Sequence, residues 1–150
     1  MSKRRFNWNL LWKLVDKYHE NAKRSLRAGA YYAGLVSVRA ALETMLYARF
    51  LMEPLDWNTE ELDDYGITVE GDMIELPEDL RLHELIEEAY RQGLLSKSGY
   101  EAANRIRHWG NMIHCSRVAG GTRLPSVSRR NVEARLDDLD IVFEQLQRTL

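Results

Sequence analysis

The segment AYYAGLVSVRAALETMLYARFLM, residues 30–52, is the longest apolar segment of the chain and therefore the best indicator of its fold. Its only charged residues are Arg39, Glu43 and Arg49. Charges near the middle of a bilayer are costly, so we expect a buried core helix here and not a membrane span. Since apolar residues lie on nearly every side of this helix, it should occupy the centre of the fold. Pro54 follows and ends it.

The segments on either side each have one apolar face, which is typical of helices packed around a central one. They are residues 7–26, residues 80–92, a helix from Ser96 or Ser98 to about Val118, and a helix from Ser126 or Ser128 to the C-terminus. Gly29 and Gly93 should end the first and third helices. The predicted fold is therefore an all-α bundle of five helices in a single domain, residues 1–150.

The connection between the second and third helices is an acidic insertion, residues 53–79. Residues 53–88 carry fourteen acidic residues against Arg81 alone. Within this segment, ITVEGDMIEL (residues 67–76) places two β-prone runs on either side of Glu70-Gly71-Asp72, which predicts a small hairpin. The acids either form a solvated surface or screen a basic cleft until RNA or a protein partner displaces them.

Charge and cysteine content bound the class of protein. The net charge of −2 hides basic ends: residues 1–52 carry ten basic residues against three acidic ones, and residues 89–150 carry ten against six. The single cysteine, Cys115, excludes an intramolecular disulfide and fits a reducing compartment. The N-terminus lacks the apolar core of a secretory signal, so a cytoplasmic protein is expected.

The stretch RIRHWGNMIH, residues 105–114, carries the clearest chemical signal. Arg107 and His114 are seven residues apart, close to two helical turns, so on one helix they would project from nearly the same face. Asn104 and Asn111 fall on that face too, and apolar residues fall on the opposite one. A guanidinium, an imidazole and two amides in one stripe can bind a phosphate and move a proton.

Two interpretations of this stripe stay open. A solvated helix also shows a polar stripe, and Arg107 would then pair with an acid of residues 53–88. His108 points about a third of a turn away and is interpreted as a flanking residue. Arg39 and Glu43, at i and i+4 in the apolar helix, either satisfy each other or reach the stripe and orient its side chains.

No metal site and no cofactor are predicted. His83, His108, His114 and Cys115 share no ligand spacing. Gly120-Gly121 follows a helix and precedes no Gly-Lys-Ser/Thr phosphate loop.

A helical bundle whose fourth helix carries an Arg, a polar residue and a His a few positions later resembles the HEPN superfamily. That family's pattern is an Arg followed after four to six residues by a His, usually with Asn, Asp or His directly after the Arg. Arg107, His108 and His114 fit it at the longest spacing. The phrases YYAGLVSVRAALETML (31–46) and LRLHELIEEAYRQGLL (80–95) look like those of a prokaryotic branch of the superfamily. The likeness covers about residues 20–150.

The resemblance implies a homodimer in which two Arg/His stripes meet in one cleft, and metal-independent cleavage of RNA of the toxin or defence kind. Arg107 and His114 would be its catalytic residues. The candidate residues for binding or orienting the substrate are Asn111, Asn104, His108, Glu43 and Arg39. Other members of the superfamily have no activity, so the alternative is a non-catalytic module that dimerises or docks a partner. An antitoxin or another protein would be that partner.

Overall fold

The computed structural model describes residues 4–5, 8–52, 68–70, 73–75, 81–113, 119–121, 123 and 125–148. Five helices make up most of this part of the chain: α1 (Trp8–Arg27), α2 (Tyr31–Met52), α4 (Leu82–Arg91), α5 (Lys97–Met112) and α7 (Arg129–Arg148). The prediction of a helical bundle of five helices is confirmed.

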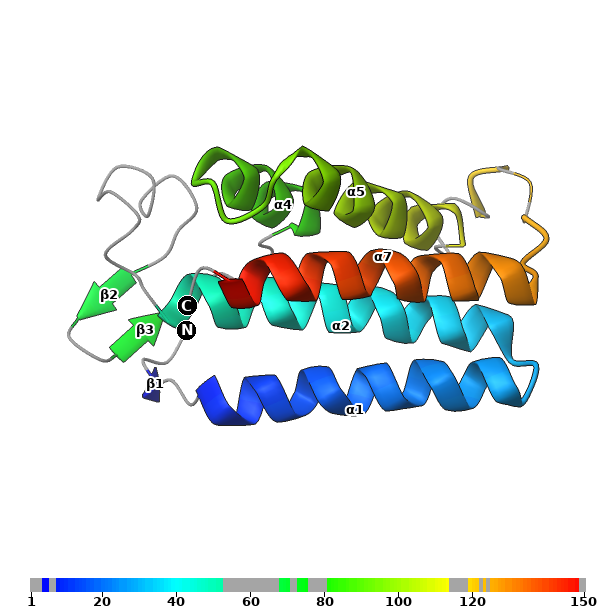
Figure 1. The fold of residues 1–150 in the computed structure, drawn as a ribbon, viewed down its shortest axis with the longest axis horizontal. Coiled ribbons are helices and arrows are strands. Elements are labelled where there is room, and N and C mark those ends of the chain that lie inside the picture. Colours follow the sequence, from blue (N-terminus) through cyan, green and yellow to red (C-terminus); the bar gives the residue numbers. More distant parts are fainter. Residues whose placement is uncertain are drawn as a thin grey trace.

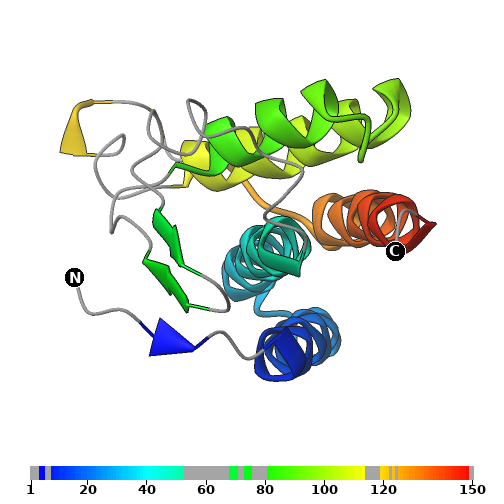
Figure 2. The same ribbon diagram turned by 90° about the vertical axis from the view of Figure 1, so that its left-hand side faces the viewer.

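Helix α2 is the centre of the bundle and contacts each of α1, α4, α5 and α7. In Figure 1, α1, α2 and α7 run side by side, and Figure 2 shows α4 and α5 together on one side of α2 and α7. Leu42, Met45 and Leu46 of α2 are almost completely buried. The prediction that residues 30–52 form the central helix is confirmed, because a helix that is apolar on every side needs partners on every side. In the described part of the chain, no helix combines the length and apolar character needed to cross a membrane.

Two glycines close the helix ends at which they were expected. Gly29 has φ 74° and Gly93 has φ 77°, a left-handed conformation that L-residues with a Cβ adopt only under strain. Beyond them, the N–H of Ala30 donates to the carbonyl of Ser25 at 2.8 Å, and the N–H of Leu94 donates to that of Ala89 at 2.9 Å. These bonds satisfy carbonyls that each helix end leaves unpaired.

The start of α7 is fixed by a reciprocal cap. The N–H of Ser128 donates to Oδ1 of Asn131 at 2.9 Å, and the N–H of Asn131 donates to Oγ of Ser128 at 3.3 Å. Because each side chain satisfies a backbone donor that the helix itself cannot, α7 begins at Arg129. Of the two predicted starts, Ser128 is the correct one.

A small sheet lies at the end of the bundle where α1 begins and α2 ends (Figure 1). Strands β2 (Thr68–Glu70) and β3 (Met73–Glu75) pair antiparallel, with Glu70 opposite Met73, inside the segment for which a hairpin is predicted. Strand β1 (Arg4–Arg5) pairs with the other edge of β3. Residues 53–67, 71–72 and 76–79 of the acidic insertion lie outside the described residues, and the choice between a solvated surface and a screen for a basic cleft falls on them.

The fourth predicted helix is shorter than expected. The apolar pattern predicts a helix to about Val118, but α5 ends at Met112, and the cap residue Ile113 has φ −98° and ψ 4°. Gly110 and Asn111, both poor helix formers, lie in the last turn. The shared helical face predicted for Arg107 and His114 therefore cannot be supplied by α5 alone, and His114 lies outside the described residues.

Candidate functional site

Arg107 lies partly buried on α5 and is held by one bond at its inner nitrogen. Nε of Arg107 donates to Oδ1 of Asn104 at 3.1 Å, one turn earlier on the same helix. Among the described residues, no carboxylate forms an ion pair with Arg107. The predicted pairing with an acid of residues 53–88 is thus not made by Glu84, Glu87 or Glu88, the acids that α4 contributes to that segment. Within the part of the chain that the structure describes, Asn104 is the one acceptor recorded for Arg107, and its terminal nitrogens bond to no side chain there.

Beside Asn104 and Arg107, Tyr100 connects α5 to α4. The hydroxyl of Tyr100 donates to Oε1 of Glu87 at 2.5 Å, and the ring of Tyr90 stacks on that of Tyr100 with centroids 4.4 Å apart. The bond to Glu87 raises the pKa of Tyr100, as do burial and the carboxylate charge, while Asn104 and Arg107 lower it. Arg107 is thus held by Asn104 on its own helix, and Tyr100, on the same helical face, bonds to a carboxylate of α4.

Tyr100 and Glu87 were not singled out from the sequence. Tyr100 precedes Asn104 by four residues and Arg107 by seven, so it belongs to the same helical face and was detectable by spacing. Glu87 carried no such signal, because its approach to Tyr100 depends on how α4 packs against α5.

On the other side of the stripe, Arg39 of α2 reaches α5. Nη1 of Arg39 donates to Oδ1 of Asn111 at 3.1 Å. The side chain of Arg39 runs across Gly110, where an added Cβ would lie 2.6 Å from Cδ of Arg39. Glu43 is partly buried and forms no ion pair with Arg39 among the described contacts. Arg39 was expected either to pair with Glu43 or to reach the polar stripe of α5. In the structure it reaches the stripe, at Asn111.

Gly110→Ala should lower the free energy of unfolding by about 1–3 kcal/mol, because the new methyl group forces Arg39 out of its place. The measurement is urea unfolding followed by circular dichroism. In an Arg39→Ala background the same change should be neutral or stabilising by up to about 1 kcal/mol, since alanine is the better helix former. An equal cost in both backgrounds would show that the contact with Arg39 is not its cause.

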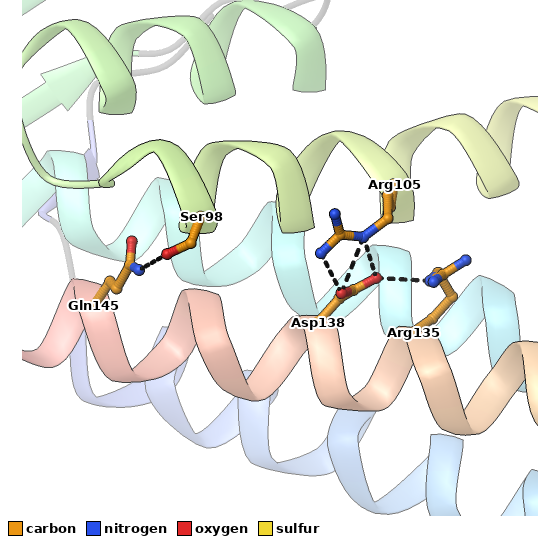
Figure 3. Close-up of polar contacts among 5 residues, drawn as sticks. All are labelled: Ser98, Arg105, Arg135, Asp138 and Gln145. Carbon is orange, nitrogen blue, oxygen red and sulfur yellow. Dashed lines mark hydrogen bonds and ion pairs between the residues drawn. The ribbon is translucent and has the colours of Figure 1, made fainter.

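A buried carboxylate of α7 joins this helix to the middle of α5 (Figure 3). Asp138 of α7 is 5% exposed. It accepts hydrogen bonds from Nε and Nη2 of Arg105, the latter at 2.8 Å, and from Nε of Arg135 at 2.8 Å. The bond to Asp138 raises the pKa of Arg105, against the effect of burial. The guanidinium of Arg135 also lies over the ring of Trp109, 5.9 Å from its centroid.

The first turn of α5 is fastened to α7 by Gln145 (Figure 3). Oε1 of Gln145 accepts from the N–H of Ser96, and Nε2 donates to Oγ of Ser98, each at 2.9 Å. At Gly99 an added Cβ would lie 1.9 Å from Oε1 of Gln145, so a side chain there would displace it. Helix α5 is thus held at its start by Gln145, in its middle by Asp138 and near its end by Arg39.

The outer face of α5 and one residue of α7 line an open groove of about 510 Å³. Its lining residues are Tyr100, Glu101, Asn104, Arg105, Arg107, His108, Trp109 and Arg135. The groove brings together three of the predicted site residues, Asn104, Arg107 and His108. Asn111, Arg39 and Glu43 do not line it, and His114 is outside the described residues. Three guanidinium groups around one opening suit a phosphate-bearing ligand, which they can bind through charge-assisted hydrogen bonds.

Within the described residues, no group of three or more His, Cys, Asp or Glu side chains is arranged to hold a metal ion. No family model matches this chain, and no curated protein or solved structure matches it.

Proposed function

We propose that this chain is a HEPN-like, homodimeric RNA-binding protein that acts as a metal-independent endoribonuclease through Arg107 and His114. The observation that supports it best is the state of Arg107. Its Nε is braced by Asn104, no described carboxylate neutralises it, and it opens into a groove that also holds Arg105 and Arg135. A guanidinium presented in this way is suited to grip the oxygens of a phosphodiester.

The proposed reaction is transesterification at the ribose 2′-hydroxyl. His114 removes the 2′-hydroxyl proton, the 2′-oxygen bonds to phosphorus, and the bond from phosphorus to the 5′-oxygen breaks. The 5′-oxygen takes a proton, which leaves a 2′,3′-cyclic phosphate and a 5′-hydroxyl. Arg107 binds the non-bridging oxygens and stabilises the charge that develops on them. DNA lacks the 2′-hydroxyl and is not a substrate.

A homodimer supplies the two groups that the reaction needs, one base and one acid. One histidine cannot act as base and acid in the same step, so the second proton transfer is assigned to His114 of a second copy of the chain. Asn104 braces Arg107, and Asn111, held by Arg39, is assigned to orient His114 or to contact a phosphate oxygen.

The alternative is a HEPN-like module that binds a partner or RNA without cutting it. One observation favours this alternative: α5 ends at Met112, so one regular helix does not carry both Arg107 and His114. An antitoxin or another protein would then be the partner, and Arg107 would contribute affinity alone.

The test is incubation of the purified chain with mixed single-stranded and structured RNAs in EDTA. Arg107→Ala and His114→Ala should each lower the cleavage rate at least about 100-fold. Arg148→Ala, which removes an exposed arginine at the end of α7, should leave the rate unchanged. The products should carry 2′,3′-cyclic phosphate ends, and sedimentation should give a dimer.

Cleavage that neither Arg107→Ala nor His114→Ala slows would contradict the assigned site. Binding of RNA without cleavage, by a dimer of unchanged stability, would favour the non-catalytic module.

A further inference from the structure

The groove contains a second cationic centre, which the Arg/His pattern does not include. Arg105 and Arg135 converge on Asp138 from α5 and α7, as Figure 3 shows. One carboxylate cannot neutralise two guanidinium groups, so the three side chains together carry one positive charge. Because Asp138 lies beneath them and is buried, that charge is presented at the groove and not inward.

Both arginines keep nitrogens free for a ligand. Arg105 uses Nε and Nη2 on Asp138, and Arg135 uses Nε. Within the described residues, Nη1 of Arg105 and both terminal nitrogens of Arg135 make no hydrogen bond that the structure records. The side chain of Arg105 is 46% exposed and that of Arg135 is 12% exposed. Arg105 is thus the side chain within easy reach of a ligand, and Arg135 supports it from below.

The second centre and Arg107 lie on opposite flanks of α5. Two residues along a helix correspond to a rotation of about 200°, so Arg105 faces α7 while Arg107 faces the α4 side. The outer surface between them carries Asn104, His108 and Glu101, all in the same groove. A ligand that touches both flanks must span about one helix diameter, about 10 Å. A single phosphate cannot do this, whereas a strand with several phosphates can.

We infer that Arg105 and Arg135, carried on Asp138, form a second phosphate subsite of the groove and that its ligand is a single-stranded RNA lying across α5. The strand places one phosphate at Arg107 and another at Arg105. This inference rests on the proposed function, because it extends the RNA-binding site around Arg107. The ligand class it selects is an oligonucleotide and not a mononucleotide.

Glu101 makes the sign of the ligand's charge testable. Its carboxylate lies in the groove close enough to Arg105 to raise the pKa of that guanidinium. A carboxylate at this position repels a phosphate and attracts a cation. Removing its charge should therefore strengthen the binding of RNA and would weaken the binding of a basic ligand.

The test is fluorescence anisotropy with a labelled ten-nucleotide single-stranded RNA of mixed sequence, titrated with the full chain at several KCl concentrations. Arg105→Gln should weaken binding about 10-fold and reduce the slope of log K against log salt by about 0.7, the value for one phosphate contact on a single strand. Glu101→Gln should strengthen binding about three-fold. Arg105→Lys, which keeps the charge and loses the forked geometry, should fall between wild type and Arg105→Gln.

Arg148→Gln is the matched control. It removes one arginine from an ion pair on α7, outside the groove, and should change the affinity less than two-fold. Should Arg105→Gln lose the fold, as judged by its melting temperature, Arg105→Lys and Glu101→Gln still decide the question.

The outcomes separate the two proposals. No binding of RNA by wild type would overturn both. Weaker binding by Arg107→Gln, with Arg105→Gln indistinguishable from Arg148→Gln, would overturn the second subsite and leave the proposed function standing. Weaker binding by Arg105→Gln alone would support the subsite and contradict the role of Arg107. Weaker binding of RNA by Glu101→Gln would overturn an anionic ligand at Arg105.

Discussion

Asp138→Asn is expected to lower the free energy of unfolding by about 2–3 kcal/mol. Asp138 is buried and is the one carboxylate bonded to both Arg105 and Arg135 in the described part of the chain. Without its charge, Arg135, only 12% exposed, keeps a buried guanidinium with no counter-ion. Removing one partner of a buried pair usually costs about 3–5 kcal/mol. The expected value is smaller because Arg105 is nearly half exposed and water compensates it.

The measurement is urea unfolding at neutral pH, with Asp137→Asn as the control. Asp137 is the neighbouring residue on α7 and is exposed, so this variant makes the same chemical change and should stay within about 0.5 kcal/mol of wild type. Equal stability of the two variants would mean that the contacts of Asp138 with its arginines contribute nothing to holding α5 on α7.

Leu46→Ala should destabilise the chain by about 3–5 kcal/mol and lower the melting temperature by about 10 °C. Leu46 is completely buried in α2, the helix that contacts all four other described helices. The walls of the resulting cavity are helices that many other contacts hold in place. These helices cannot move inward to fill the cavity, so its full cost remains.

Thermal and urea unfolding of Leu46→Ala should be compared with Val36→Ala on the same helix. Val36 is 59% exposed, so its truncation loses little buried area and should change stability by less than about 0.5 kcal/mol. A cost for Leu46→Ala no larger than that for Val36→Ala would be incompatible with a central position for α2.

The candidate site was predictable only in part. Spacing along one helix placed Asn104 beside Arg107, and the structure confirms their contact. Apolar periodicity predicts a helix that continues past Met112. Gly110 and Asn111 weaken the last turn, and α5 ends at Met112. Because His114 lies beyond the end of α5, this helix does not provide the helical face predicted to carry both Arg107 and His114.

Sequence left Ser126 and Ser128 open as the start of α7, and the structure selects Ser128. The five-helix bundle, the central place of α2 and the helix ends at Gly29 and Gly93 follow from the sequence alone. These features depend on apolar periodicity and on caps made between residues only a few positions apart, so local sequence contains all the information they need.

The surroundings of the outer face of α5 depend on how the helices pack, which local sequence does not specify. Arg105 meets Asp138 across 33 positions, Arg39 meets Asn111 across 72, and Arg4 of β1 pairs with Ile74 of β3 across 70. Each of these contacts forms only after two elements have packed against each other. The distance and rotation between those elements cannot be derived from the residues of either one alone. The charge and the bracing of the groove are therefore properties of the packed bundle, whereas the presence of Arg107 on a polar stripe is a property of the sequence.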